Sequence, residues 1–400
     1  MMTNMNIFMS MRMNNLEENI MKKICCLLIL VILNNVNLSQ EKIITTTTTT
    51  TVTEVRSVNK SEKNVEIVFV LDTTGSMGGL INRAKTKIWN IVNDILQNQS
   101  KGTKVKIGLI GYRDRGDEYV TKVIPLSENI DDTYSELMSF VAAGGGDTPE
   151  DVRRALYEAV NNIQWSNSNK NLTKIIFLVG DAPPHEDYQD HPSTIVTAKQ
   201  AKEKGIIINT IQCGNLSNTN KFWRDIAQNA NGEYFAIPQD GGSYVMRTPY
   251  DEKLETLANE LDRKYIPYGK IAAQRAAMSD KMMKDAKISG GATTEAKADR
   301  AKNKALNKYS YSSNDLIQAL ENESVELSSL KQEELPETMQ KMSKVEQEKY
   351  VDNLIEERNK IRDEITKISK EREVYIKKNS KSNKDNFDAS VSKALEKQIK

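Results

Sequence analysis

Apolar positions between residues 64 and 266 repeat with two different periods. An apolar run at Val65–Leu71 has the length and the β-branched content of a buried strand. After this run, apolar residues recur every three or four positions, at Leu80, Ala84, Ile88, Val92 and Ile95. That spacing places them on one face of a helix. The region is therefore expected to begin with a strand followed by a helix.

The same alternation continues to residue 265. Further strands are expected at 105–112, 119–126, 174–179, 206–212 and 233–237. Further helices are expected at 131–141, 149–163, 193–203, 221–230 and 250–265. This order predicts an α/β fold with a doubly wound, mostly parallel six-stranded sheet and helices on both faces. In such folds ligands bind at the carboxyl ends of the strands.

Composition divides the chain into five segments. They are an N-terminal extension with a signal peptide (1–39), a threonine-rich linker (40–63), the α/β domain (64–266), a partly helical linker region (267–342) and a tail with a long helix or coiled coil (343–400). The linker contains seven consecutive threonines, Thr45–Thr51, and has too little apolar content to form a core. Gly290 and Gly291 interrupt the helical pattern of the linker region.

An export signal is predicted near the N-terminus. Met21–Lys23 supply a basic start, and the ten apolar residues Ile24–Leu33 are too few to span a bilayer. A cleavage point at Ser39 follows, and Met21 is an alternative start of translation to Met1. We expect an exported protein, periplasmic, on the cell surface or secreted, with no stable membrane span after signal cleavage. An uncleaved membrane anchor is the alternative.

A long helix is predicted in the tail. Ser343 and Glu346 form a capping box at its start, and helical spacing continues to about Lys377. A seam with alternating steps of three and four comprises Val351, Leu354, Arg358, Ile361, Ile365, Ile368, Arg372 and Tyr375. The seam has two interpretations. The helix either folds back on the helices before it as an antiparallel hairpin, or self-associates with a second copy of the chain.

Charge and cysteine content exclude several classes of protein. The 56 basic and 55 acidic side chains give a net charge of +1, so no attraction to nucleic acid is expected. A hydrophobic content of 38% excludes a polytopic membrane protein. Of the three cysteines, Cys25 and Cys26 fall in the signal, which leaves Cys213 and excludes a disulfide scaffold or a four-thiolate metal site.

Three polar segments fall at the carboxyl edge of the predicted sheet. They are residues 72–77 (DTTGSM), 144–150 (GGGDTPE) and 180–185 (GDAPPH). Mg²⁺ prefers about six oxygen ligands, and Gly75 gives the first turn the freedom to point residues 72, 74 and 76 at one spot. Taken alone, Thr148–Asp151 has the features of an ordinary helix start and Asp181 those of a turn residue. Together the three segments favour a metal site.

The pattern Asp-x-Thr-x-Ser, with a later Thr and Asp, resembles the metal-ion-dependent adhesion site of von Willebrand factor type A (vWA) domains. The resemblance covers about Asn64–Tyr265. The segments DTTGSM, GYRDRGDEY and GGGDTPED resemble those of a vWA subgroup shared by bacterial exported proteins and a family of eukaryotic kinases.

This resemblance implies a metal site with defined roles. The hydroxyls of Thr74, Ser76 and Thr148 would bind Mg²⁺ directly, with Mn²⁺ or Ca²⁺ as alternative ions. Asp72 and Asp181 would act largely through water. One coordination position stays open, so the resemblance implies a protein partner that completes the site with an exposed Glu or Asp.

Further candidates surround this site. Asp114, Asp147 and His185 are expected at its rim, and an ordinary surface turn is an equal interpretation for Asp114. His185, Asp187, Asp190 and His191 could form a second metal cluster. A solvated loop is the favoured interpretation of these four residues, because nothing in the sequence brings them to one point.

Three functions compete. The leading hypothesis is an exported, noncatalytic binding or adhesion protein, and not an enzyme, that grips a partner through Mg²⁺. The second is a structural assembly protein organised by its coiled-coil tail. The third is a metal-dependent phosphoryl-transfer enzyme with Asp72 as the acceptor, which is disfavoured because position 74 is threonine and no Gly-Lys-Ser/Thr phosphate-binding loop occurs.

Overall fold

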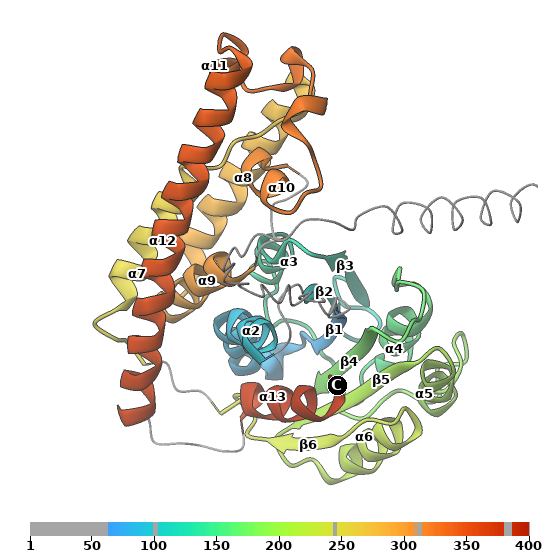
Figure 1. Ribbon diagram of the computed structural model, residues 1–400. Coiled ribbons are helices and arrows are strands. Elements are labelled where there is room, and N and C mark those ends of the chain that lie inside the picture. The colour runs from blue at the N-terminus through green and yellow to red at the C-terminus, as the bar shows by residue number, and fades with distance from the viewer. Residues whose placement is uncertain are drawn as a thin grey trace, which may run out of the picture. The chain divides into compact units, whose positions relative to one another are not determined.

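A six-stranded β-sheet forms the centre of the computed structural model (Figure 1). The strands are β1 (Asn64–Asp72), β2 (Lys104–Tyr112), β3 (Thr121–Ser127), β4 (Leu172–Gly180), β5 (Ile206–Cys213) and β6 (Tyr234–Ile237). Their order is β3-β2-β1-β4-β5-β6. Strand β3 runs antiparallel to β2, and all other neighbours are parallel. The predicted mostly parallel sheet is confirmed.

The structure describes residues 63–98, 103–242, 246–307, 309, 314–379 and 386–399. The predicted N-terminal extension, the signal peptide and almost all of the threonine-rich linker lie outside these ranges. Within the described ranges, no helix is both long enough and apolar enough to cross a membrane.

Helices cover both faces of the sheet (Figure 1). One face carries α2 (Gly78–Asn98) and α3 (Ile130–Leu137), and the other carries α4 (Val152–Asn161), α5 (Thr194–Glu203) and α6 (Ser217–Asn229). Side chains alternate along β1, so that Ile67 and Phe69 pack with α2 while Val68 and Val70 pack with α4. This period of two is what buries a parallel strand on both faces.

Helix α4 begins later than its predicted span of 149–163. Asp151 is its N-cap, and the Asp151 carboxylate accepts a hydrogen bond from the Arg154 amide at 3.0 Å. Glu150 instead forms an isolated bridge with Pro184. Thr148 is therefore not the capping residue of this helix, and it lies on an exposed loop ahead of the cap.

A second group of helices follows the sheet. Its α-helices are α7 (Asp251–Asp262), α8 (Ile271–Gly291), α9 (Thr294–Leu306), α10 (Leu316–Glu321), α11 (Glu337–Gln340), α12 (Lys344–Asn379) and α13 (Phe387–Gln398). Helix α8 ends at Gly291, where the glycine pair was expected to interrupt the helical pattern. Three short 3-10 helices, η1 (Gly75–Met77), η2 (Leu327–Ser329) and η3 (Gln332–Glu334), complete the elements of the described residues.

The predicted seam of α12 is buried against helices of the same chain. Ile365 packs with α7 and α9, and Val351 packs with α10 and α11. Arg358 contacts Asp315, and Arg372 contacts two buried aspartates of α7 and α9. The helix therefore folds back on the helices before it, as the first interpretation predicts, and self-association stays a prediction.

Helix α13 completes the α/β core from the far end of the chain. Phe387 and Val391 belong to the same apolar cluster as α2 and the sheet, and the ring of Phe387 lies 6.0 Å from that of Phe69. Arg83 of α2 pairs with Asp388. In Figure 1, α13 lies between α2 and the strands β4 to β6. The core thus takes in a helix that the sequence grouped with the tail.

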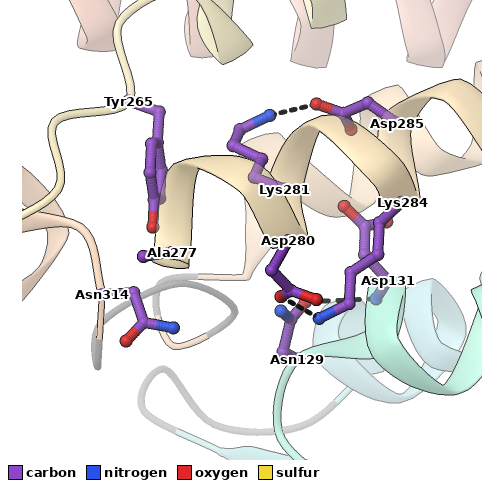
Figure 2. Close-up of a pocket in the computed structure, with 9 residues that line it drawn as sticks. All are labelled: Asn129, Asp131, Tyr265, Ala277, Asp280, Lys281, Lys284, Asp285 and Asn314. Carbon is purple, nitrogen blue, oxygen red and sulfur yellow. Dashed lines mark hydrogen bonds and ion pairs between the residues drawn. The ribbon is translucent and has the colours of Figure 1, made fainter. Parts of the chain in front are cut away.

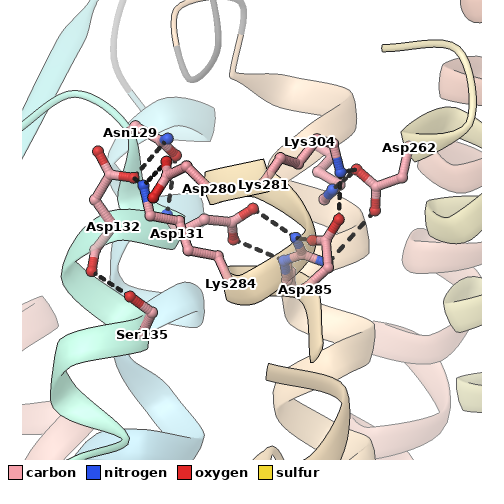
Figure 3. Close-up of polar contacts among 11 residues, drawn as sticks. Asn129, Asp131, Asp132, Ser135, Asp262, Asp280, Lys281, Lys284, Asp285 and Lys304 are labelled. Atoms are coloured by element: carbon pink, nitrogen blue, oxygen red, sulfur yellow. Dashed lines mark hydrogen bonds and ion pairs between the residues drawn. The ribbon is translucent and has the colours of Figure 1, made fainter. Parts of the chain in front are cut away.

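Helix α9 carries charged side chains at buried positions. Arg300 contacts Asp131 of α3 and Asp285 of α8. Lys304 contacts Asp262 of α7 (Figure 3). Buried charges are tolerated only where they are paired, and each of these pairs joins α9 to a different helix. The network therefore fixes α3, α7 and α8 around α9.

Candidate functional site

The turn after β1 brings carboxylate and hydroxyl oxygens together. Asp72 is the last residue of β1 and is fully buried. Its Oδ1 accepts hydrogen bonds from the Thr74 amide at 2.9 Å and from the Thr74 hydroxyl at 2.6 Å. The hydroxyl oxygens of Thr74 and Ser76 lie 3.4 Å apart. Because the Thr74 hydroxyl gives its proton to Asp72, its lone pairs remain available for a cation.

Asp181 lies directly after β4, the neighbour of β1, so both aspartates stand at the point where the sheet order reverses. Burial and the adjacent charge of Asp181 raise the pKa of Asp72 to about 7, although hydrogen bonds from Thr74 oppose the shift. The Asp181 carboxylate accepts a hydrogen bond from the Gln239 side chain at 2.7 Å. Gln239 is a contact that the sequence analysis did not identify.

The glycine-rich loop reaches the same turn. The Gly75 amide donates to the Gly144 carbonyl at 3.2 Å. Gly144 and Gly145 have φ angles of 78° and 81°, and the Asp117 carboxylate accepts a hydrogen bond from the Gly145 amide at 3.0 Å. A Cβ atom at Gly144 would lie 2.2 Å from Asp117, so only glycine fits there. The loop that carries the exposed Thr148 is thus held beside the β1 turn.

Glu150 is a buried site residue that the sequence analysis missed. It is 3% exposed, its amide donates to the Pro183 carbonyl, and its carbonyl accepts from the His185 amide, each at 3.0 Å. Burial and the charges of Asp72 and Asp114 raise the pKa of Glu150 to about 9. An acidic residue is favourable at the start of a helix, and Glu150 follows Thr148 by two positions. The sequence around Glu150 therefore did not indicate a role in the site.

The donor set fits a divalent cation. Asp72 Oδ2 and Glu150 Oε2 are both buried and accept no hydrogen bond among the described residues. The charges that act most strongly on these two groups are other carboxylates. Buried, unpaired carboxylate oxygens and the hydroxyls of Thr74 and Ser76 are the kinds of ligands that Mg²⁺ takes. A bound cation would supply the missing positive charge.

The three residues expected at the rim come together. Ligand atoms of Asp114, Asp147 and His185 all lie within 4.8 Å of one another. The alternative metal cluster of His185, Asp187, Asp190 and His191 is divided. His185 pairs with Asp187, whereas the ring of His191 stacks on Tyr157.

A separate polar pocket lies between α3 and α8 (Figure 2). It is lined by Asn129, Asp131, Tyr265, Ala277, Asp280, Lys281, Lys284, Asp285 and Asn314. Lys281 pairs with Asp285, and Lys284 pairs with Asp280. Because these charges neutralise one another, the pocket contributes to helix packing and supplies no free charge for a ligand.

Part of the chain matches a known protein family. Residues 66–249, a little under half of the chain, match the family model of the von Willebrand factor A domain. The match supports a vWA domain at these residues. Such domains are typically noncatalytic modules for protein interaction or adhesion, and they often bind a divalent metal.

A relative and several solved structures match parts of the chain. An ariadne-like RING finger protein of Acanthamoeba polyphaga mimivirus is 34% identical over 126 residues, which are 30% of this chain and only 11% of that protein. BatB from Bacteroides thetaiotaomicron has a TM-score of 0.34 and 17% identity, over 44% of this chain and 90% of BatB. The SpRpn10 VWA domain has a TM-score of 0.33 and 17% identity, over 45% of this chain and 89% of that domain.

Proposed function

We propose that the vWA domain is a noncatalytic binding module that holds an acidic side chain of a partner protein through a divalent cation. The residues that would hold the ion are Asp72, Thr74, Ser76, Thr148 and Asp181. Mg²⁺ is the proposed ion, with Mn²⁺ or Ca²⁺ as alternatives. When bound, the ion supplies a positive centre with an open position for an outside carboxylate.

The unpaired Asp72 Oδ2, buried at the end of β1, carries this proposal. A buried carboxylate oxygen without a partner costs free energy unless a cation or a proton satisfies it. Thr74 fixes the other oxygen of the same carboxylate, so Oδ2 is held in one orientation. Glu150 adds a second unpaired carboxylate oxygen from the loop that follows Thr148.

The two competing functions receive less support. A phosphoryl acceptor of this type needs a second aspartate two positions on, whereas position 74 is threonine and its hydroxyl donates to Asp72 Oδ1. Assembly through the α12 seam would need an apolar stripe on the surface, yet Val351 and Ile365 are buried within the chain.

Export is proposed from the sequence alone. Ile24–Leu33 has the length of a signal-peptide core and lies outside the described residues. We propose that the protein is a bacterial one that acts in the periplasm, on the cell surface or outside the cell, where partner proteins with exposed Glu or Asp are available to it.

Calorimetric titration of metal-free, full-length protein with Mg²⁺ tests the ion site. Ser76→Ala removes one hydroxyl at the site, and Ser168→Ala removes an exposed hydroxyl far from it. We expect Ser76→Ala to weaken Mg²⁺ binding and Ser168→Ala to bind like the wild type. Equal Mg²⁺ affinity in wild type and Ser76→Ala would contradict the proposed ion site.

Peptide display tests the partner chemistry. Peptides selected on the protein in Mg²⁺ and released with EDTA should share a Glu or Asp, and replacing it by Gln or Asn should abolish binding. Selected peptides that still bind in EDTA, and also bind Ser76→Ala, would show that the domain recognises partners without the ion.

A further inference from the structure

We propose that Asp114, Asp147 and His185 form a second metal site, which takes a divalent transition metal of the zinc class. The three residues come from different loops, after β2, within the glycine-rich loop and after β4. His185 Nε2 lies 3.7 Å from Asp114 Oδ2 and 3.6 Å from Asp147 Oδ2. None of the three is among the five ligands of the proposed Mg²⁺ site, so this inference stands independently of that function.

The histidine is oriented as a metal ligand. Its Nδ1 lies 2.8 Å from Asp187 Oδ1, and in the neutral imidazole that carboxylate favours the ring proton on Nδ1. The lone pair of Nε2 then points toward the carboxylates of Asp114 and Asp147. Nε2 is buried and has no hydrogen-bond partner among the described residues. A lone pair that faces two carboxylates is repelled by them, and a cation between the three groups removes that repulsion.

Outer residues hold the proposed ligands in place. The Tyr188 hydroxyl donates to both oxygens of Asp114 at 3.1 Å, and its ring stacks on His185 with centroids 4.2 Å apart. Arg115 lies over the Tyr188 ring at 3.7 Å. Asp187 and Tyr188 therefore orient a histidine and a carboxylate at once, as the outer residues of metal sites do.

The spacing and chemistry select the class of metal. Zinc takes nitrogen and carboxylate ligands at about 2.0–2.2 Å in a tetrahedron, so neighbouring ligand atoms lie about 3.4 Å apart. The two separations at Nε2 exceed this value by only a few tenths of an ångström. An imidazole ligand favours zinc and similar transition metals over Mg²⁺ and Ca²⁺. A solvent molecule would take the fourth position.

The site connects with the β1 turn through the backbone. Asp147 is next to Thr148 in the chain, and the His185 amide donates to the Glu150 carbonyl at 3.0 Å. A metal held by Asp147 and His185 would join the glycine-rich loop to the loop after β4. Order in the exposed part of the glycine-rich loop would then depend on the second metal.

Zinc binding by untagged, chelator-treated full chain tests the proposal. Cys25→Ser and Cys26→Ser are introduced in every variant so that the two thiols contribute nothing. Affinity is measured by competition with a chromophoric chelator, and Co²⁺ is used as a spectroscopic probe. His185→Ala and Asp147→Asn are each expected to weaken zinc at least about tenfold, and Asp187→Asn about 10- to 100-fold.

His191→Ala is the matched control, because His191 is the other histidine of the chain and stacks on Tyr157 instead. It should leave zinc affinity and the Co²⁺ spectrum unchanged. Asp147 is exposed, so Asp147→Asn keeps the test valid if His185→Ala fails to fold. Wild-type zinc affinity in folded Asp147→Asn and His185→Ala would overturn the proposal, as would an equal loss in His191→Ala. Ser76→Ala should keep zinc binding, which separates this site from the proposed Mg²⁺ site.

Discussion

Arg358 and Asp315 form a buried two-point ion pair between α12 and the start of α10. The two nitrogen–oxygen distances are 2.6 and 3.0 Å, and both residues are almost fully buried. The Asp315 carboxylate also accepts a hydrogen bond from the Ile266 amide at 3.1 Å. One ion pair thus connects the long helix to the chain segment that leaves α7.

Removing one member of this pair should destabilise the helical region strongly. Asp315→Leu leaves the Arg358 charge buried without its carboxylate, and we expect a loss of about 3 kcal/mol in the free energy of unfolding. The double variant Arg358→Met with Asp315→Leu should lose less, because no charge remains buried. Urea denaturation measures both. Glu356→Ala, in an exposed pair with Lys360, should change little. A double variant as unstable as Asp315→Leu alone would contradict this account.

Low pH should weaken the network of ion pairs around α9, because it protonates Asp262. Burial alone would raise the pKa of Asp262, but the charges of Lys304, Arg300 and Lys281 outweigh it and lower the pKa below its usual 3.8. A lowered pKa in the folded state contributes stability above about pH 4 that is lost as the pH falls further. Urea midpoints measured from pH 5 to pH 2 should fall steeply in the wild type and less steeply in Asp262→Asn. Parallel curves would contradict the role given to Asp262.

The opposite pH dependence is expected at the β1 turn. The folded-state pKa of Asp72 is about 7 against an ordinary 3.8, so metal-free protein should lose stability as the pH rises between these values. The slope from this group is at most about 1.4 kcal/mol per pH unit. Millimolar Mg²⁺ should reduce the loss, because the ion replaces the proton on the carboxylate.

Asp72→Asn is the control for that prediction. It cannot titrate, so its stability should be flatter than that of the wild type between pH 4 and 7, and Mg²⁺ should have little effect on it. A wild-type slope in Asp72→Asn would assign the pH dependence to another group. Thermal unfolding in matched buffers with EDTA or Mg²⁺ makes the comparison.

Helix α13 should contribute to the stability of the α/β core. Phe387 is 1% exposed and lies against Phe69, so Phe387→Ala should cost about 3 kcal/mol through lost burial and the cavity left behind. Val374→Ala, at a position that is 67% exposed, is the control and should change little. If Phe387→Ala is as stable as the wild type in urea, α13 is not part of the cooperative core.

Local pattern sufficed for most of the α/β fold. The buried run at β1 and the period of α2 predict their elements to within three residues, because a strand and a helix each impose one spacing on buried side chains. The pattern could not show that Asp151 rather than Thr148 caps α4. That choice depends on the bridge between Glu150 and Pro184, which are far apart in the sequence.

The sequence likewise could not predict those parts of the site that depend on contacts between distant segments. Parallel strands end at one edge, so the approach of Asp72 to Asp181 follows from the order of strands alone. The inward position of Glu150 depends on the loop after β4, and nothing in its own neighbourhood distinguishes it from an acid at a helix start. The place of α13 depends likewise on packing between distant segments.

The position of α13 also bears on how the chain is made. The ribosome synthesises residues 387–398 long after it has completed β6, so the part of the sheet face that α13 covers lacks this helix through the synthesis of α7 to α12. Phe69 then lacks the ring of Phe387 as a packing partner on the nascent chain. Final closure of the α/β core is therefore a late event that follows the synthesis of α12.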